Sequence, residues 1–399
     1  MNLFTEYPER DEKKHFQLVA QQVTLNLEKL YGDKPRALRD THAKTHACVR
    51  GTLEIFDFDE SAIKARLKQT VLSERLSDDE IDAIALKKGL FATPKCYPVW
   101  IRFANGRTEV EDDYIGDARS MSVKVMGIEG DRLPDSHEAH TQDLITQNAE
   151  IFFIKTIKNY YGFFKSVVKA GLWPLLWMLF HPFQLLALQS VTKRYPKSLL
   201  TQRCWSGSAS ALGLPNDFEV PESRPEPGLE PVKYPVVVKY GFTPVACDAP
   251  HKPLPEESRE WTSRAQAKRR RRASNMPDYY YRDELIQSLS KPEAKYCWNF
   301  EIQVQTSPKQ SIDDVTVMWP EDKAPFFTVG RLTVSHQVID IEAQFCENLR
   351  FSPWNGLAVH RPIGALNRLR AGVYKQVGEY RLRKQGLEYQ EPTGEETFG

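Results

Sequence analysis

Short stretches in which apolar and polar residues alternate recur along most of the chain, and they constrain its fold more than any other feature. In residues 49–55, for example, apolar or small residues alternate with Arg50, Thr52 and Glu54. Successive side chains of a strand point to opposite faces of a sheet, so the pattern predicts strands with one buried face. Further strand-like stretches are residues 97–106, 118–130, 143–154, 234–243, 298–306 and 326–334. Because many strands precede helices at the end of the chain, the expected fold class is α+β.

Helices are predicted at both ends of the chain and between the strands. An apolar repeat from Phe16 to Leu30 predicts one amphipathic N-terminal helix that packs against the body and ends near Gly32. Residues 57–93 are charged and predict a helical pair, and residues 283–289 predict a short helix. The last helix is expected over residues 366–383.

Three residues of the last predicted helix stand out: Arg370, Tyr374 and Arg381. Their spacing of four and seven places them on one helix face. Cations close to a phenol stabilise its anionic form, and tyrosinate is a known ligand of haem iron. The alternative is that the three side chains are solvated or stacked without a ligand role.

Two histidines, His42 and His46, precede the strand at residues 49–55. A zinc site at this spacing would need a helix and further ligands, which the sequence does not indicate. The alternative is a pair of loop histidines without a role.

Charge and cysteine content exclude some classes of protein. The net charge of +1 gives no overall field for nucleic acid, so none is expected as a partner. Without a CxxC pair a thiolate zinc site is not favoured, and scattered single cysteines are typical of a reducing compartment. The first residues do not resemble a secretory signal, so the expected location is the cytoplasm. The six cysteines are Cys48, Cys96, Cys204, Cys247, Cys297 and Cys346.

The segment at residues 160–190 is largely apolar but contains Pro174, His181 and Pro182. These residues argue against a plain transmembrane helix and favour a helical hairpin at a bilayer interface. The alternative is a buried pair of core helices. A basic run at residues 268–272 would usually be solvated, but it could also contact anionic lipid. The protein is therefore expected in the cytoplasm or peripherally on a membrane.

Several segments resemble those of the haem catalase superfamily, and they occur in the same order. Arg39 to Lys44, RDTHAK, is similar to the catalase R-V-V-H-A-K segment, and Arg370 to Tyr374, RAGVY, is similar to R-L-F-A-Y. The resemblance runs from about residue 36 to residue 383. Its other segments are Ile101–Phe103, Asp117–Lys124, Asp143–Ile154, Trp298–Gln305 and Asp313–Pro320.

This resemblance implies an antiparallel eight-stranded β-barrel surrounded by helices, with haem b as cofactor. It implies a haem domain over residues 36–399, preceded by an N-terminal helical arm at residues 1–35. His42 would be the distal acid and base, Tyr374 would bind the haem iron, and Arg370 would pair with Tyr374. Three further arginines would hold the haem propionates, namely Arg39, Arg102 and Arg381.

The chain also departs from the catalase pattern. Thr41 stands where catalases have Val, as in coral-type allene oxide synthases of this superfamily. The distal amide falls on Gln147 or on Asn148, and the alignment leaves both open. No flavodoxin-like C-terminal domain is expected, and the apolar segment at residues 160–190 is an addition.

The expected activity is that of a haem enzyme acting on peroxides in oxidative metabolism. An organic or fatty-acid hydroperoxide, handled by an isomerase, peroxidase or lyase reaction, is favoured because of the apolar segment. The alternatives are dismutation of hydrogen peroxide and a haem- or lipid-binding protein with little turnover. A homo-oligomer is compatible with the sequence.

Overall fold

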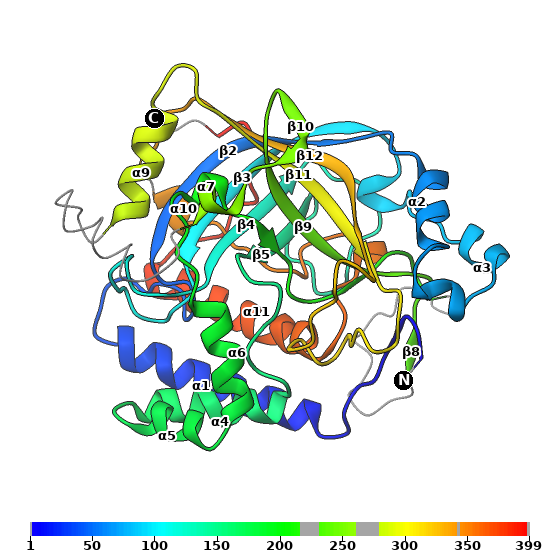
Figure 1. Cartoon of the computed structure of the whole chain (residues 1–399). Helices are drawn as coiled ribbons and strands as arrows, with labels where there is room; N and C mark the ends of the chain where they lie inside the picture. Colours follow the sequence, from blue (N-terminus) through cyan, green and yellow to red (C-terminus); the bar gives the residue numbers. More distant parts are fainter. Residues whose placement is uncertain (1, 216–230, 261–278, 341–343, 397–399) are drawn as a thin grey trace.

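The computed structural model describes residues 2–215, 231–260, 279–340 and 344–396. At its centre is an antiparallel sheet in which eight strands close into a barrel (Figure 1). The predicted α+β class and the predicted barrel are therefore confirmed. In order around the barrel the strands are β9 (Val237–Ala246), β11 (Lys295–Val304), β12 (Phe326–Ser335), β2 (Thr45–Ile55), β3 (Lys95–Asn105), β4 (Arg119–Met126), β5 (Thr141–Gln147) and β6 (Cys204–Trp205).

The barrel closes through a strand of only two residues. In β6, Trp205 pairs with Gln147 of β5, and Cys204 pairs with Phe242 of β9. Two further strands, β7 (Ser210–Ala211) and β10 (Ala249–Pro253), pair with β9 outside the closed ring. Apart from the barrel, β1 (Thr5–Glu6) pairs with β8 (Val232–Lys233).

Alternation along the strands separates a barrel core from an outer layer. Ile101 and Phe103 of β3 lie in the main hydrophobic core. On the other face of the same wall, Cys48 and Trp100 belong to a separate cluster that includes residues of α10 (Gln344–Asn348). Gly51 of β2 allows β12 to approach, because a Cβ there would lie 2.6 Å from the Thr333 carbonyl oxygen. The outer face of β2 and β3 is therefore a packing surface for later parts of the chain.

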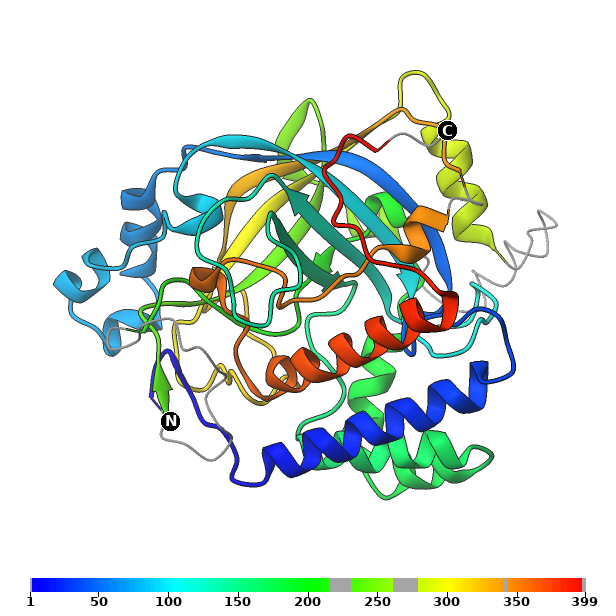
Figure 2. The same cartoon turned by 180° about the vertical axis from the view of Figure 1, so that it is seen from behind.

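Three helices form a layer beside the barrel (Figures 1 and 2). They are α1 (Glu12–Tyr31), α4 (Ile157–Lys169) and α11 (Ala365–Gln385). The helix α11 lies between the barrel and α1, as Figure 2 shows. Val23 and Leu27 of α1, Phe164 of α4 and Leu369 of α11 share one buried cluster. The predicted N-terminal and last helices are thus confirmed.

The apolar segment after α4 forms two short helices at the periphery, α5 (Trp173–Leu179) and α6 (Pro182–Thr192) (Figure 1). The alternative of a buried core pair is wrong, because most of their large apolar side chains are exposed. In the described part of the chain, no single helix is long and apolar enough to span a bilayer. Helices α5 and α6 are long and apolar enough only when they are counted together, and the chain bends by 112° between them.

The remaining helices are short. The predicted helical pair at residues 57–93 consists of α2 (Glu60–Leu67) and α3 (Asp78–Asp82), and a further helix is α7 (Glu256–Arg259). The predicted helix at residues 283–289 is α9 (Tyr280–Leu289). One-turn 3₁₀ helices occur at Val71–Glu74, Gly89–Phe91, Leu199–Thr201 and Ala358–His360.

Three sequence-based expectations need correction or fall outside the described residues. The strand expected over residues 143–154 ends at Gln147. The cysteines are not all single, because Cys48 pairs with Cys346 and Cys247 pairs with Cys297 in disulfides. The basic run at residues 268–272 lies outside the described residues.

Candidate functional site

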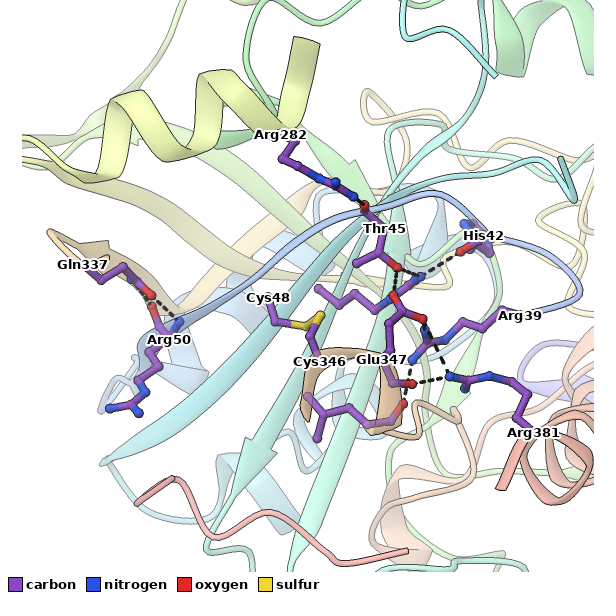
Figure 3. Close-up of a disulfide and its surroundings, with 12 residues drawn as sticks. Arg39, His42, Thr45, Cys48, Arg50, Arg282, Gln337, Cys346, Glu347 and Arg381 are labelled. Atoms are coloured by element: carbon purple, nitrogen blue, oxygen red, sulfur yellow. Dashed lines mark hydrogen bonds and ion pairs between the residues drawn. A yellow bond between two sulfur atoms is a disulfide. The ribbon is translucent and has the colours of Figure 1, made fainter. Parts of the chain in front are cut away.

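Three arginines distant in sequence converge on one carboxylate. Two of them, Arg39 and Arg381, are labelled beside Glu347 in Figure 3. Arg39 donates to Glu347, with 3.0 Å between Nη1 and Oε2. Arg381 lies 3.7 Å from the same oxygen and also donates to the Glu347 backbone carbonyl. Arg102 reaches the group through Thr45: its Nη2 lies 2.5 Å from the Thr45 hydroxyl, which donates to Glu347. We call these five residues the arginine cluster.

Four different parts of the fold supply the charged residues of the arginine cluster, and Thr45 is the first residue of β2. Arg39 follows α1, Arg102 is in β3, Arg381 is in the last turns of α11, and Glu347 is in α10. The Cys48–Cys346 disulfide fixes α10 to the outer face of β2, directly beside Glu347 (Figure 3). The cluster is therefore assembled by the tertiary fold on the outside of the barrel wall.

The charges of the arginine cluster depend on one another. Burial raises the pKa of Glu347, but Arg39, Arg102 and Arg381 outweigh it and lower that pKa to about 2. Burial is also the main reason why the pKa of Arg381 falls to about 9, with Arg39 acting in the same direction. Such a group of guanidiniums binds carboxylates well, because each one offers several aligned donors.

His42 lies at the edge of the arginine cluster in an unusual backbone conformation. Its φ is +59°, in the left-handed region that residues other than glycine rarely adopt. Two hydrogen bonds hold it there: its N–H donates to the Gly106 carbonyl at 3.3 Å, and its carbonyl accepts from Arg102 Nη2 at 2.7 Å. Asp117 in turn accepts from the Gly106 N–H at 2.9 Å. Non-glycine residues in such conformations are concentrated at functional sites.

The His42 imidazole is kept neutral. Burial lowers its pKa, and the charges of Arg102 and Arg370 lower it further, to about 3. Its Nδ1 is buried and has no hydrogen-bond partner among the described residues. The ring therefore carries a nitrogen that can bond to an added molecule.

His46 has a structural position and does not belong to a loop, contrary to expectation. It lies in β2, is buried, and its Nε2 is 2.7 Å from the Asn105 side-chain oxygen. Among the residues that the structure describes, no group of three or more His, Cys, Asp or Glu side chains could hold a metal ion.

The face of α11 that carries Arg370 and Tyr374 is turned toward the region of His42. Arg370 Nη1 donates to Ser208 Oγ and to Asn367 Oδ1, both at 3.2 Å, and its charge acts on His42. Tyr374 lies one turn further along and is half-buried. The expected pairing of Arg370 with the Tyr374 phenol stays a prediction, because the hydrogen bonds of Arg370 go to Ser208 and Asn367.

A buried ion-pair network fixes the start of α11. Arg368 donates to Glu12 Oε1 at 2.7 Å and to Asp313 Oδ1 at 2.9 Å, and it also pairs with Glu6. The network connects α11 to the N-terminal segment and to the loop after β11. The register of α11, and hence the position of Tyr374 and Arg381, depends on it.

The two candidates for the distal amide differ in their partners. Asn148 accepts from the Arg119 N–H at 2.7 Å, and its buried Nδ2 has no partner among the described residues. Gln147 instead uses its side-chain nitrogen locally, on the Ile151 carbonyl at 3.0 Å. Thr41 lies in the loop between α1 and β2 and is half-buried.

The arginine cluster fits the carboxylates of a haem. A carboxylate already occupies its centre, and the Nε atoms of Arg102 and Arg381 are buried without partners in the described structure. Tyr374 and His42 add a phenol and an imidazole, which are two of the side-chain types that can bind haem iron. Sequence reasoning missed Thr45, Ser208 and Glu347, and no local pattern marks them.

A closed eight-stranded antiparallel barrel, with helices packed around it and this site on its outer wall, defines a catalase-like fold. Solved structures of catalases match the chain over most of its length. They are a fungal catalase (18% identity, TM-score 0.58), a bacterial catalase (16%, 0.59) and catalase A from Saccharomyces cerevisiae (16%, 0.60). The matches cover 89%, 89% and 93% of this chain.

This chain spans only part of each catalase, namely 61% of the fungal, 60% of the bacterial and 67% of the yeast protein. No family model and no curated protein sequence matches it.

Proposed function

We propose that this protein is a haem b enzyme that acts on peroxides, with an organic or fatty-acid hydroperoxide as preferred substrate. The catalase-like fold supports the general class. The observation that carries the proposal is the convergence of Arg39, Arg102 and Arg381 on one carboxylate beside His42 and α11.

In this proposal the three arginines bind the haem carboxylates in place of Glu347, and Tyr374 provides the phenolate for the iron. Haem supplies the redox chemistry that breaks the O–O bond. Arg370, on the same helix as Tyr374, contributes a positive charge that acts on His42.

His42 is suited to move the proton. Because its pKa is lowered to about 3, the ring is neutral near pH 7 and can accept a proton from a bound hydroperoxide. The same ring can then return the proton to the leaving oxygen. Asn148 is the better candidate to orient the peroxide, since its Nδ2 is free of other partners in the described residues. Gln147 is the alternative, and Thr41 would shape the space beside His42.

The preference for an apolar hydroperoxide rests on the exposed helices α5 and α6. Helix α6 packs on α5 and α5 packs on α4, which packs in turn against α11, the helix that carries Tyr374. An apolar substrate held at that surface would lie on the layer of helices to which α11 belongs. Dismutation of hydrogen peroxide is the alternative reaction.

Haem titration of purified protein tests the ligand assignment. We expect uptake with a high-spin ferric tyrosinate spectrum, and Tyr374→Phe should change that spectrum. Tyr380→Phe, on the same helix, is the control and should leave the spectrum unchanged. An unchanged spectrum in Tyr374→Phe would refute the assignment.

Turnover tests the reaction. The haem-loaded protein should consume a fatty-acid hydroperoxide faster than it releases oxygen from hydrogen peroxide. His42→Ala should keep haem bound but lose activity by about 100-fold or more, because the proton acceptor is gone. Full activity in His42→Ala would contradict the distal role, and fast oxygen release would favour dismutation.

A further inference from the structure

The helices α5 and α6 present a large apolar surface to solvent. Of the twelve large apolar side chains that are exposed in the described residues, eight lie between residues 172 and 186. Phe180 and Phe183, at the bend, are each 82% exposed, and Leu172 is 71% exposed. Contiguous exposed apolar surface of this kind marks an interaction site. We call it the hairpin surface: Leu172, Trp173, Leu175, Leu176, Leu179, Phe180, Phe183 and Leu186.

The hairpin is anchored to the body by its other face. Met178 of α5 and Val191 of α6 are buried. The Trp177 ring contacts Phe163 of α4, with 5.6 Å between ring centroids, and a Cβ at Gly162 would lie 2.8 Å from Trp177 Nε1. The exposed side chains are therefore held outward on a supported element.

The bend is set by local chemistry. Pro182 starts α6, and the His181 ring stacks on Trp177 at 3.8 Å while its Nδ1 lies 2.7 Å from the Trp177 carbonyl. At 1.5 Å per residue, α5 and α6 are about 10 Å and about 16 Å long. Both are much shorter than the roughly 30 Å of a bilayer core, so the hairpin fits within one leaflet.

The charge around the hairpin surface selects its partner. Between Glu150 and Asp217 the sequence contains no acidic residue and eight lysines or arginines. Three of the eight pair with acidic residues from other parts of the chain, namely Lys155, Arg194 and Arg203. Lys169 lies over the Trp173 ring at 4.2 Å, at the border of the apolar surface. In a symmetric dimer each copy would bring these cations against its partner's cations, which disfavours a second copy as occupant. The eight are Lys155, Lys158, Lys165, Lys169, Lys193, Arg194, Lys197 and Arg203.

We propose that α5 and α6 are a membrane anchor that inserts the hairpin surface into one leaflet of an anionic bilayer. Exposed lysines on α4 and at the end of α6, among them Lys165 and Lys193, then contact the lipid headgroups. The hydrocarbon of the leaflet covers the apolar side chains, which water otherwise contacts. The inference depends on neither haem binding nor peroxide turnover.

Flotation of the full chain with lipid vesicles tests the anchor. The vesicles contain phosphatidylcholine alone or with roughly one-third phosphatidylglycerol. The wild-type chain should float with the anionic vesicles and lose binding as salt is raised. The double variant Phe180→Glu with Phe183→Glu should bind the anionic vesicles at least about tenfold more weakly than wild type, because two large apolar groups no longer insert. Val338→Glu changes a side chain that is 80% exposed elsewhere, and it should bind like wild type.

Three outcomes would overturn the anchor. One is that the wild-type chain stays in the lipid-free fraction with both vesicle types. Another is that the double variant binds as well as Val338→Glu. The third combines two results. The wild-type chain binds no vesicles, and it sediments as a dimer whereas the double variant sediments as a monomer. The hairpin surface would then be an interface between copies. Circular dichroism checks that both variants are folded.

Discussion

At the scale of single residues, Glu347 and the guanidiniums around it depend on each other because all of them are removed from water. Replacing one partner of a buried ion pair leaves the other charges without compensation. Glu347→Gln should therefore lower the free energy of unfolding of the cofactor-free protein by about 3 kcal/mol. Glu54→Gln alters an exposed carboxyl on β2 and should change the free energy of unfolding by less than about 0.5 kcal/mol. Urea unfolding of both variants measures the difference.

The same substitution separates haem binding from simple stability. If the haem carboxylates replace the Glu347 carboxylate, Glu347→Gln removes their competitor, and haem affinity should rise by about tenfold. Haem dimethyl ester, which has no free carboxylates, should bind the variant and wild type equally. A variant that binds haem more weakly than wild type would show that Glu347 does not compete for the arginines.

His42 predicts a pH dependence of stability. Its pKa is about 3 in the folded protein, against 6.5 for a free imidazole. Below pH 6.5 the unfolded chain takes up a proton that the folded His42 does not, so stability falls as the pH falls from 6.5 toward 3. The slope for one proton is about 1.4 kcal/mol per pH unit. His42→Gln should reduce the measured slope by that amount, whereas an unchanged slope would place the protonation elsewhere.

At the scale of elements, the two disulfides close loops of different length. Cys48–Cys346 spans 298 residues and fixes α10 to β2, whereas Cys247–Cys297 spans 50 residues. In the loop-entropy account the longer loop stabilises by about 1–2 kcal/mol more. Cys346→Ser should therefore lower the unfolding free energy more than Cys247→Ser does. Unfolding under non-reducing conditions measures this, and Cys96→Ser, at an exposed free cysteine, is the control.

The strands that were predicted from sequence are those whose alternation is local. Val49 to Ile55 alternates because one face lies in the barrel core, and the pattern is visible without the rest of the fold. Barrel closure by Cys204 and Trp205 was not predictable, because two residues carry no period and their partners are distant. The end of β5 at Gln147 was missed because the apolar residues Ile151 to Ile154 after it imitate a strand.

The residues of the candidate site that could be proposed from the sequence are likewise those that lie in a local sequence pattern. His42, Arg370 and Tyr374 lie in recognisable segments, so the resemblance could propose them. Glu347 is meaningful only because α10 is bound to β2 by a disulfide, and pairing of distant cysteines cannot be read from their spacing. The expectation of scattered single cysteines failed at this point.

At the scale of the whole molecule, the hairpin surface and the arginine cluster are connected through one layer of helices. Helix α4 packs against α1, α5 and α11, so a chain held on a bilayer by α5 and α6 keeps α11 at a fixed height above it (Figure 2). If both proposals hold, a hydroperoxide in the leaflet meets the protein on the layer of helices that includes α11. A small hydroperoxide in water gains nothing from this arrangement.

Turnover of two substrates, one embedded in the bilayer and one dissolved in water, tests whether the anchor delivers substrate. The double variant Phe180→Glu with Phe183→Glu should lose about tenfold or more of its activity toward a fatty-acid hydroperoxide embedded in anionic vesicles. Its activity toward tert-butyl hydroperoxide in water should equal that of wild type, because neither phenylalanine contacts the arginine cluster. Equal loss on both substrates would mean that the substitutions damage the site itself. If the double variant loses vesicle binding but retains its activity toward both substrates, the anchor localises the protein without delivering its substrate.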